Sequence, residues 1–180
     1  MELPNILICG KMCSGKSTLC SSIREMYPQY IKTAFASKVK EIAKDLFFMD
    51  ENIKDRDLLI NIGSKMREIN PDVWVDYVIK NCKADENIII DDLRYYNEYE
   101  KIINTSGKRW VIIYLKISHK LQLERLKKTY PENWQEHLKH INHHSETLDY
   151  DKLKYDLVIN VDDLKITDLM DYVSQLLLKK

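Results

Sequence analysis

Residues 10–17 read Gly10-Lys11-Met12-Cys13-Ser14-Gly15-Lys16-Ser17 and match the pattern G-x-x-x-x-G-K-[ST], which is typical of loops that cradle phosphate groups. The residues on either side support this interpretation. Residues 5–9 are an apolar run that suits a buried strand, and residues 18–26 carry apolar side chains at helical spacing. Strand, glycine loop and helix follow one another in the order that the motif requires.

The residue types in this loop explain the chemistry it can perform. Gly10 and Gly15 permit backbone angles and close approaches that a Cβ atom would block. The amide groups of the loop and the start of the helix then favour an anion. Lys16 is expected to reach the β- and γ-phosphates of a nucleoside triphosphate, and Ser17 to offer its hydroxyl to Mg²⁺.

The composition indicates one soluble globular domain. A chain of 180 residues can bury a substantial core, and a content of 44% hydrophobic and 31% charged residues is ordinary for such a domain. Lys and Arg total 28, and so do Asp and Glu, which gives a net charge of +0. We therefore expect neither a nucleic acid nor a membrane as partner. The sequence leaves open whether the protein is a monomer or a homodimer.

Cysteine use and the N-terminus favour an intracellular protein. Cys9, Cys13, Cys20 and Cys82 include no pair with CxxC spacing, so we interpret them as reduced thiols. Residues 1–4 lack the features of a signal peptide, and no apolar run approaches membrane-spanning length. The predicted location is the cytoplasm, that of a host cell if the protein is viral.

Strand-like and helix-like segments alternate along the chain, which predicts an α/β fold with a parallel sheet flanked by helices. The five predicted strands cover residues 5–9, 30–35, 87–90, 110–116 and 155–160. The predicted helices cover residues 18–26, 38–48, 55–69, 71–81, 95–105 and 119–128, and a closing helix that begins at Asp163.

Several local details follow from the same patterns. Met26 and Leu46 fall at helical spacing with the apolar residues before them, so we expect both to face inward. Ser37 is a candidate cap for the helix after it, and Pro71 is expected in the first turn of its helix. Ser118 is a further candidate cap.

Two carboxylates, Asp91 and Asp92, follow the strand that contains Ile88, Ile89 and Ile90. In open α/β sheets ligands bind beyond the carboxyl ends of the strands, so this acidic pair should lie near the phosphate loop. One of the two can hold a Mg²⁺-bound water, and we favour Asp92 because Arg94 follows it by two residues.

A phosphate loop specifies a nucleotide site but not a reaction. The chain lacks the N-K-x-D and D-x-x-G patterns of a small GTPase, and we expect an AAA-type ATPase or a motor to be longer. A kinase that acts on a small acceptor remains. Such an enzyme must neutralise several phosphates with arginines from different directions. The candidates are Arg56, Arg67, Arg94 and Arg125. The alternative for each arginine is a surface ion pair, and we favour this alternative for Arg56.

The chain resembles the phage-type deoxynucleoside monophosphate kinases, within the adenylate-kinase-like P-loop kinases. Residues 35–40, Phe-Ala-Ser-Lys-Val-Lys, are similar to the F-A-x-x-L-K segment of that family, and residues 63–74 to its G-x-x-x-R and P-D-x-W elements. Residues 92–98, Asp-Leu-Arg-Tyr-Tyr-Asn-Glu, resemble D-V-R-x-x-N-E, and residues 143–146 resemble a lid H-x-S-E element. Met12-Cys13 and Asp91 depart from the family pattern.

The resemblance implies a P-loop kinase fold in one domain, residues 1–180, with a nucleoside monophosphate-binding helical region at about 37–82 and a lid at about 126–150. It implies transfer of the γ-phosphoryl group of ATP to a deoxynucleoside monophosphate, with Mg²⁺. Lys16, Arg94, Arg125 and Asp92 would be catalytic. ATP would be bound by Gly10, Met12, Cys13, Ser14, Gly15, Lys16, Ser17 and Thr18, the metal by Ser17 and, through water, Asp92, and the acceptor by Lys38, Arg67, Trp74, Arg94, Tyr95 and Glu98.

Three alternatives stay open. Trp74 can belong to the core rather than to a base-binding wall. The enzyme can act on another phosphorylated metabolite, of the phosphomevalonate type, or the protein can bind a nucleotide without transferring phosphate. The histidines 137, 140, 143 and 144 can suggest zinc, but we favour a solvated lid face because no cysteine or suitably spaced carboxylate completes a site.

Overall fold

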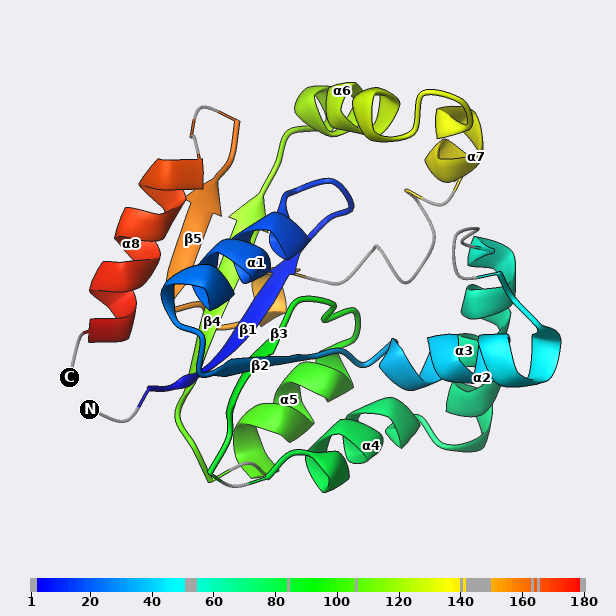
Figure 1. Ribbon diagram of the computed structural model, residues 1–180, viewed down its shortest axis with the longest axis horizontal. Coiled ribbons are helices and arrows are strands. Elements are labelled where there is room, and N and C mark those ends of the chain that lie inside the picture. Colours follow the sequence, from blue (N-terminus) through cyan, green and yellow to red (C-terminus); the bar gives the residue numbers. More distant parts are fainter. Residues whose placement is uncertain are drawn as a thin grey trace.

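The computed structural model describes residues 3–50, 55–83, 85–105, 107–139, 141, 150–162, 164 and 166–178. These residues form a five-stranded parallel sheet with helices on both faces (Figure 1), which confirms the predicted fold class. The strands are β1 (Asn5–Gly10), β2 (Tyr30–Thr33), β3 (Asn87–Ile90), β4 (Trp110–Lys116) and β5 (Leu157–Asn160). The helices are α1 (Lys16–Met26), α2 (Ser37–Phe47), α3 (Arg56–Ile69), α4 (Val73–Asn81), α5 (Tyr96–Thr105), α6 (His119–Thr129), α7 (Trp134–Lys139) and α8 (Ile166–Leu178), and a 3₁₀ turn covers Tyr150–Lys152.

The strand order, β2-β3-β1-β4-β5, places the phosphate loop at the centre of the sheet. β1 pairs in parallel with β3 on one side and with β4 on the other. The register aligns Leu7 with Ile90, so the loop after β1 and the acidic pair after β3 leave the same edge of neighbouring strands. This topology brings together the two motifs that the sequence analysis predicted to be close.

The alternation of side chains along β1 explains why both faces of the sheet are covered. Ile6 and Ile8 are fully buried in a cluster that includes residues of α1 and α8, whereas Leu7 and Cys9 are fully buried in a second cluster with residues of α4 and α5. An apolar side chain at every position is what a central parallel strand requires, because successive residues point to opposite faces.

A third, smaller apolar cluster connects the phosphate loop to α6 and α7. Met12 from the loop packs with Leu126 of α6 and with Ile141. The side chains of Cys13 and Tyr130 lie partly buried against it. Figure 1 shows α6 and α7 beyond the carboxyl ends of the strands, with α2 and α3 to the side of the sheet.

Two side chains that were expected to face inward do not. Met26 is 53% exposed and Leu46 is 68% exposed, although both follow the helical spacing of their buried neighbours. Each lies in the last turn of its helix, α1 or α2. Helical spacing predicts the direction of a side chain but not whether another element covers it there.

Three predicted boundaries are also corrected. β2 ends at Thr33 rather than at residue 35, because Phe35 turns its backbone N–H toward Asp92. Ser37 is the first residue of α2 and not its cap; the N-cap is Ala36, which makes no side-chain capping bond. α4 begins at Val73, so the first turn of this helix lies after Pro71.

Other expectations on helix starts have mixed outcomes. Ser118 caps α6 as predicted, since its hydroxyl accepts a hydrogen bond of 3.2 Å from the Leu121 amide. The predicted start of the closing helix at Asp163 lies outside the described residues, and α8 is described from Ile166.

Candidate nucleotide and acceptor site

The backbone of the phosphate loop has the conformation that its glycines permit. Gly10 and Gly15 have φ angles of 148° and 102°, and Cys13 adopts a left-handed φ of 63°. A Cβ atom on Gly10 would lie only 2.6 Å from the Leu115 carbonyl oxygen and 2.7 Å from Ser14 Oγ. The loop therefore needs glycine at position 10, and its tight path over β1 and β4 depends on that residue.

Lys16 lies folded over the same loop. Its ammonium donates hydrogen bonds to the carbonyl oxygens of Gly10 and Lys11, at 2.6 and 2.8 Å. Burial lowers the pKa of Lys16 from 10.5 to about 8; the positive charge of Arg94 acts in the same direction, and Asp91 opposes it. A bound phosphate would place a negative charge beside this buried ammonium.

The other loop residues occupy different surroundings. Ser17 is exposed and lines a cavity, while Thr18 is exposed in the first turn of α1. Ser14 is buried, and the structure contains, within the residues it describes, no hydrogen-bond partner for Ser14 Oγ. A buried hydroxyl in a phosphate loop fits a site that binds a further polar group.

Arg125 supports the phosphate loop from its outer side. Its guanidinium donates to the carbonyl oxygens of Cys13 and Ser14, both at 3.2 Å, and to that of Val161 at 3.4 Å. Gln122, also on α6, donates to the Met12 carbonyl at 3.0 Å. In this arrangement Arg125 holds the loop with three of the five N–H donors of its guanidinium.

The two carboxylates of the acidic pair have different partners, and the sequence did not predict this difference. The carboxylate of Asp92 accepts hydrogen bonds from the backbone amides of Phe35 and Ala36, at 3.0 and 2.9 Å. Asp91 instead forms an ion pair of 2.7 Å with Lys32 of β2. Both oxygens of Asp92 thus hold the β2–α2 connection, whereas Asp91 pairs with a side chain.

Two features of its surroundings act on the pKa of Asp92 in opposite directions. Burial raises the pKa of this carboxyl, and the two amide hydrogen bonds act against that shift because they favour the charged form.

Arg67 is held in place by three groups at the other end of the site. Its Nη2 donates to the buried carboxylate of Glu98 at 2.7 Å, and its Nη1 donates to the Gly63 carbonyl at 3.3 Å. The guanidinium carbon lies 4.0 Å from the centre of the Tyr95 ring. This stacked and ion-paired arrangement presents a fixed cation to the cavity.

Glu98 is buried behind the cavity lining in this structure. It is 1% exposed, and besides Arg67 it accepts from the backbone amides of Arg94 and Tyr95 at 3.0 and 3.1 Å. Because Tyr95 immediately precedes α5 and Glu98 is the third residue of that helix, the carboxylate satisfies N–H groups at the helix start. Burial raises the pKa of Glu98, and the Arg67 charge opposes that shift.

Two of the predicted acceptor-binding residues lie elsewhere. Trp74 is 2% exposed and donates from Nε1 to the Gly63 carbonyl at 3.2 Å, so the core alternative holds for this side chain. Lys38 pairs with Glu41 at 2.7 Å on an exposed part of α2. Lys40, two residues further on, lines the cavity instead.

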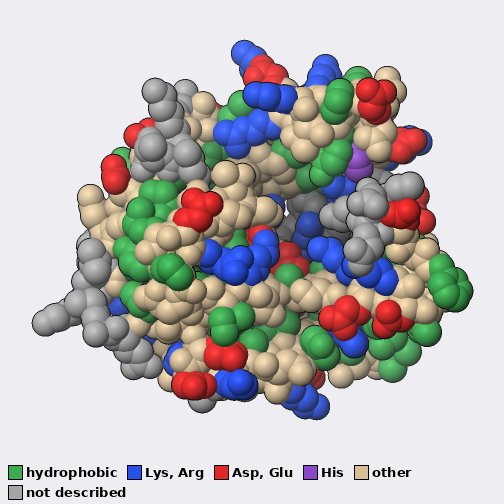
Figure 2. Space-filling view, viewed as in Figure 1, with side chains coloured by type: hydrophobic (Ala, Val, Ile, Leu, Met, Phe, Trp, Pro, Cys, Tyr) green, Lys and Arg blue, Asp and Glu red, His purple; other side chains and the backbone are tan. Residues whose placement is uncertain are grey.

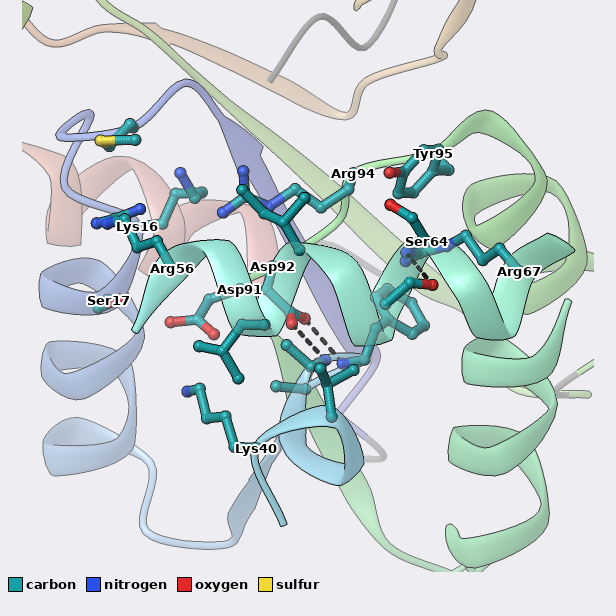
Figure 3. Close-up of a pocket in the computed structure, with 18 of the residues that line it drawn as sticks. Lys16, Ser17, Lys40, Arg56, Ser64, Arg67, Asp91, Asp92, Arg94 and Tyr95 are labelled. Atoms are coloured by element: carbon teal, nitrogen blue, oxygen red, sulfur yellow. Dashed lines mark hydrogen bonds between the residues drawn. The ribbon is translucent and has the colours of Figure 1, made fainter. Parts of the chain in front are cut away.

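A cavity of about 360 Å³ unites the loop, the acidic pair and the arginines. Figure 2 shows it as a hollow with Lys and Arg side chains on its rim, and Figure 3 shows its lining side chains. Its lining comprises Met12, Cys13, Lys16, Ser17, Lys32, Ala34, Phe35, Ala36, Val39, Lys40, Arg56, Leu59, Ile60, Gly63, Ser64, Arg67, Asp91, Asp92, Arg94 and Tyr95. A basic cavity with an apolar wall suits an anionic ligand that also carries a planar or apolar group.

Sequence reasoning missed Lys32, Lys40 and Ser64, and it favoured the surface for Arg56. A signal was present for Arg56 and Ser64, because both lie on the same helical face as Arg67. For Lys32 and Lys40 no motif in the sequence marked them out.

The histidine and membrane predictions are tested in part. His137 is buried, and the centre of its ring lies 3.9 Å from the centre of the Tyr130 ring. Histidines 140, 143 and 144 lie outside the described residues. Over the described ranges, no group of three or more His, Cys, Asp or Glu side chains could hold a metal ion. Along the same part of the chain, none of the helices combines the length and apolar character needed to cross a membrane.

The fold and the loop together define a P-loop protein with a kinase-like α/β fold. Two solved structures share this fold along nearly the whole chain. A gluconokinase from Sinorhizobium meliloti 1021 is 16% identical with a TM-score of 0.60, covering 98% of this chain and 91% of that one. The Mycobacterium tuberculosis APS kinase CysC, in complex with AMPPNP and APS, is 12% identical with a TM-score of 0.59, covering 99% and 100%.

A family model described as an AAA domain matches residues 6–149, and the chain belongs to this family. We had expected an AAA-type ATPase to be longer than this chain, and the match to the AAA domain family shows that this expectation was wrong. No curated protein matches the chain.

Proposed function

We propose that the protein is an ATP-dependent kinase that phosphorylates a nucleoside monophosphate, and specifically a deoxynucleoside monophosphate. The observation that carries this proposal is the shared cavity. Lys16 and Ser17 of the phosphate loop line one part of it, and Arg67, Arg94 and Tyr95 line another. One cavity can thus hold the phosphates of a donor and those of an acceptor, with an aromatic ring beside the acceptor part.

The proposed reaction is the transfer of one phosphoryl group. An oxygen of the acceptor phosphate forms a bond to the γ-phosphorus of ATP, the bond from that phosphorus to the β–γ bridging oxygen breaks, and ADP leaves. The acceptor oxygen is already anionic at neutral pH, so no general base is required. The enzyme's contribution is to align the two phosphates and to neutralise their charge, which is the role we assign to Lys16 and Arg94.

A magnesium ion accompanying ATP fits the residues that are present. Ser17 and Asp91 line the same cavity, and a hydroxyl and a carboxylate are oxygen ligands of the kind that Mg²⁺ prefers. Ser17 would hold the ion directly and Asp91 through water, with most ligands taken from phosphates and water. When bound, the ion would neutralise charge on the β- and γ-phosphates.

A second candidate is a kinase for another small metabolite. Among the solved structures with the same fold are a gluconokinase and an APS kinase. Their identities of 16% and 12% indicate the fold and not the substrate. A phosphorylated metabolite of the phosphomevalonate type would also match the basic acceptor end of the cavity.

A coupled assay of ADP release distinguishes these functions. The purified protein is offered ATP, Mg²⁺ and, one at a time, the eight common ribo- and deoxynucleoside monophosphates and phosphomevalonate. We expect ADP release with at least one deoxynucleoside monophosphate, and we expect Lys16→Ala to abolish it while the circular dichroism spectrum is unchanged. Release with phosphomevalonate alone would favour the second candidate. ATP binding without any transfer would indicate a nucleotide-binding protein.

A further inference from the structure

Helix α3 presents one continuous face to the cavity. Its lining residues, Arg56, Leu59, Ile60, Gly63, Ser64 and Arg67, follow the spacing of a single helical stripe. Arg67 follows Arg56 by 11 positions in α3 (Arg56–Ile69), which is about three helical turns. Both arginines therefore point the same way, with roughly 16 Å between them along the helix axis. α3 therefore carries a guanidinium at each end of one wall.

The two ends of α3 serve different parts of the site. Figure 3 shows Arg67 on the side of Tyr95 and Ser64, and Arg56 on the side of Lys16 and Ser17. Arg67 is the cation already assigned to the acceptor end. By the same geometry Arg56 belongs to the end of the cavity formed by the phosphate loop.

The bonds of Arg56 leave it able to bind an anion. Its Nη2 donates to the Tyr130 hydroxyl at a long 3.4 Å, and its guanidinium carbon lies 5.8 Å from the centre of that ring. Its Nε is buried, and the part of the chain that the structure describes offers it no hydrogen-bond acceptor. A buried donor without an acceptor is costly. The guanidinium is therefore incompletely satisfied by the described chain and would gain from an anion in the cavity that Arg56 lines.

Electrostatics place Arg56 close to the loop as well. Burial raises the pKa of the Cys13 thiol, and the charges of Lys16, Arg56 and Arg125 oppose that shift. Of these three cations, Arg125 already donates to three backbone carbonyls. Arg56 is thus an arginine that lies close to the loop and also lines the cavity.

We propose that Arg56 binds the phosphate groups of the ATP donor, and that α3 contacts both substrates, the donor through Arg56 and the acceptor through Arg67. This inference rests on the proposed kinase function. It gives α3 a part in phosphate binding through Arg56, for which the sequence analysis favoured a surface ion pair. Tyr130, at the end of α6, acts as a positioning residue that keeps the Arg56 guanidinium at the mouth of the loop.

Binding of the ATP analogue AMPPNP with Mg²⁺, measured by isothermal titration calorimetry without any acceptor, tests this assignment. We expect Arg56→Met to weaken AMPPNP binding by about tenfold or more, since a hydrogen bond to a charged group is lost. Arg56→Lys should recover part of the affinity. Lys65→Met is the matched control, because Lys65 is an exposed residue of α3 that pairs with Glu68, and its affinity should equal that of the wild type.

The possible outcomes separate the two proposals. If the wild type binds AMPPNP, and Arg56→Met binds it equally well and melts at the wild-type temperature, the assignment of Arg56 is wrong and the kinase proposal stands. If the wild type does not bind AMPPNP, both are wrong. Arg67→Met, by contrast, should leave AMPPNP affinity unchanged and raise the KM for the acceptor found in the ADP-release assay.

A double-mutant cycle tests the role of Tyr130. Tyr130→Phe removes the hydroxyl and keeps the ring, so we expect a two- to fivefold loss of AMPPNP affinity in the wild-type background and none in Arg56→Met. Equal losses in both backgrounds would show that Tyr130 does not act through Arg56.

Discussion

At the scale of single residues, the site is determined by which backbone groups each charged side chain meets. Lys16 donates hydrogen bonds to two carbonyl oxygens of its own loop, and Arg125 donates to three carbonyl oxygens. Asp92 accepts hydrogen bonds from two amides of the β2–α2 connection. Asp91 meets a side chain instead, the ammonium of Lys32. Residues that look equivalent in the sequence therefore differ in whether their charge is available to a ligand.

The lowered pKa of Lys16, about 8, predicts a pH-dependent affinity for nucleotide. A bound triphosphate favours the charged lysine, so above pH 8 binding must be accompanied by proton uptake, and the affinity for AMPPNP should fall as the pH rises from 7.5 to 9.5. Calorimetry at pH 8.5 in buffers of different ionisation enthalpy measures the uptake directly. A constant affinity over this range with no proton uptake would contradict the prediction.

The division of roles between Asp91 and Asp92 predicts two different phenotypes. Asp91→Asn should raise the Mg²⁺ concentration needed for half-maximal transfer and lower stability less than Asp92→Asn, because the asparagine oxygen can still accept from Lys32, which is 36% exposed. Asp92→Asn should lower the free energy of unfolding by about 1–3 kcal/mol, since it disturbs two partly buried hydrogen bonds to backbone amides. Urea unfolding and a Mg²⁺ titration measure the two quantities. The reverse result would restore the magnesium role first predicted for Asp92.

At the scale of elements, α3 and α5 are coupled through Glu98. The carboxylate of Glu98 caps the start of α5 and at the same time pairs with Arg67 of α3. Gly63 contributes as well, since its carbonyl accepts from both Arg67 and Trp74. The acceptor end of the cavity is therefore built by two helices whose relative position depends on a few polar contacts.

Glu98→Gln should raise the KM for the acceptor by about tenfold and leave the affinity for AMPPNP unchanged, because Arg67 loses its charged partner while the phosphate loop is untouched. Steady-state kinetics with each substrate varied in turn measure the two effects. Glu100→Gln, an exposed carboxylate on the same helix, is the control. If both substrates were affected equally, or if only the melting temperature changed, Glu98 would have a structural role alone.

At the scale of the whole molecule, the cavity is formed by segments far apart in the chain. The loop after β1, the connection after β2, helix α3 and the connection after β3 all contribute side chains to its lining. Their convergence depends on the strand order, which places β3 between β2 and β1. A ligand that spans the cavity therefore contacts several segments between residues 12 and 95 at once.

A bisubstrate mimic, in which ATP and the accepted nucleotide are joined through their phosphates, should stabilise the folded protein strongly. At a hundred times its dissociation constant it would add about 2.7 kcal/mol to the free energy of unfolding, and the melting temperature should rise by several degrees. Differential scanning calorimetry measures the rise. Lys16→Ala should remove most of it, and an equal rise in that variant would show that the mimic binds somewhere other than the phosphate loop.

Much of the fold and part of the site could be read directly from local patterns. The glycine spacing of residues 10–17, the apolar strands and the alternation of strands with helices are properties of short segments, so they predicted the parallel sheet and the position of the phosphate loop. The same patterns placed Asp91, Asp92 and Arg94 at the carboxyl edge of the sheet, next to that loop.

The direction and environment of individual side chains depended on the folded chain. Lys40 rather than Lys38 lines the cavity because two residues on a helix differ by about 200° around its axis. Asp91 and Asp92 meet different partners because the chain turns at Phe35 and Ala36 to meet only one of them. Arg56 reached the cavity, and Trp74 the core, through the packing of helices that are separate in sequence. A local pattern predicts which element a residue belongs to, but the contacts between elements decide what its side chain can bind.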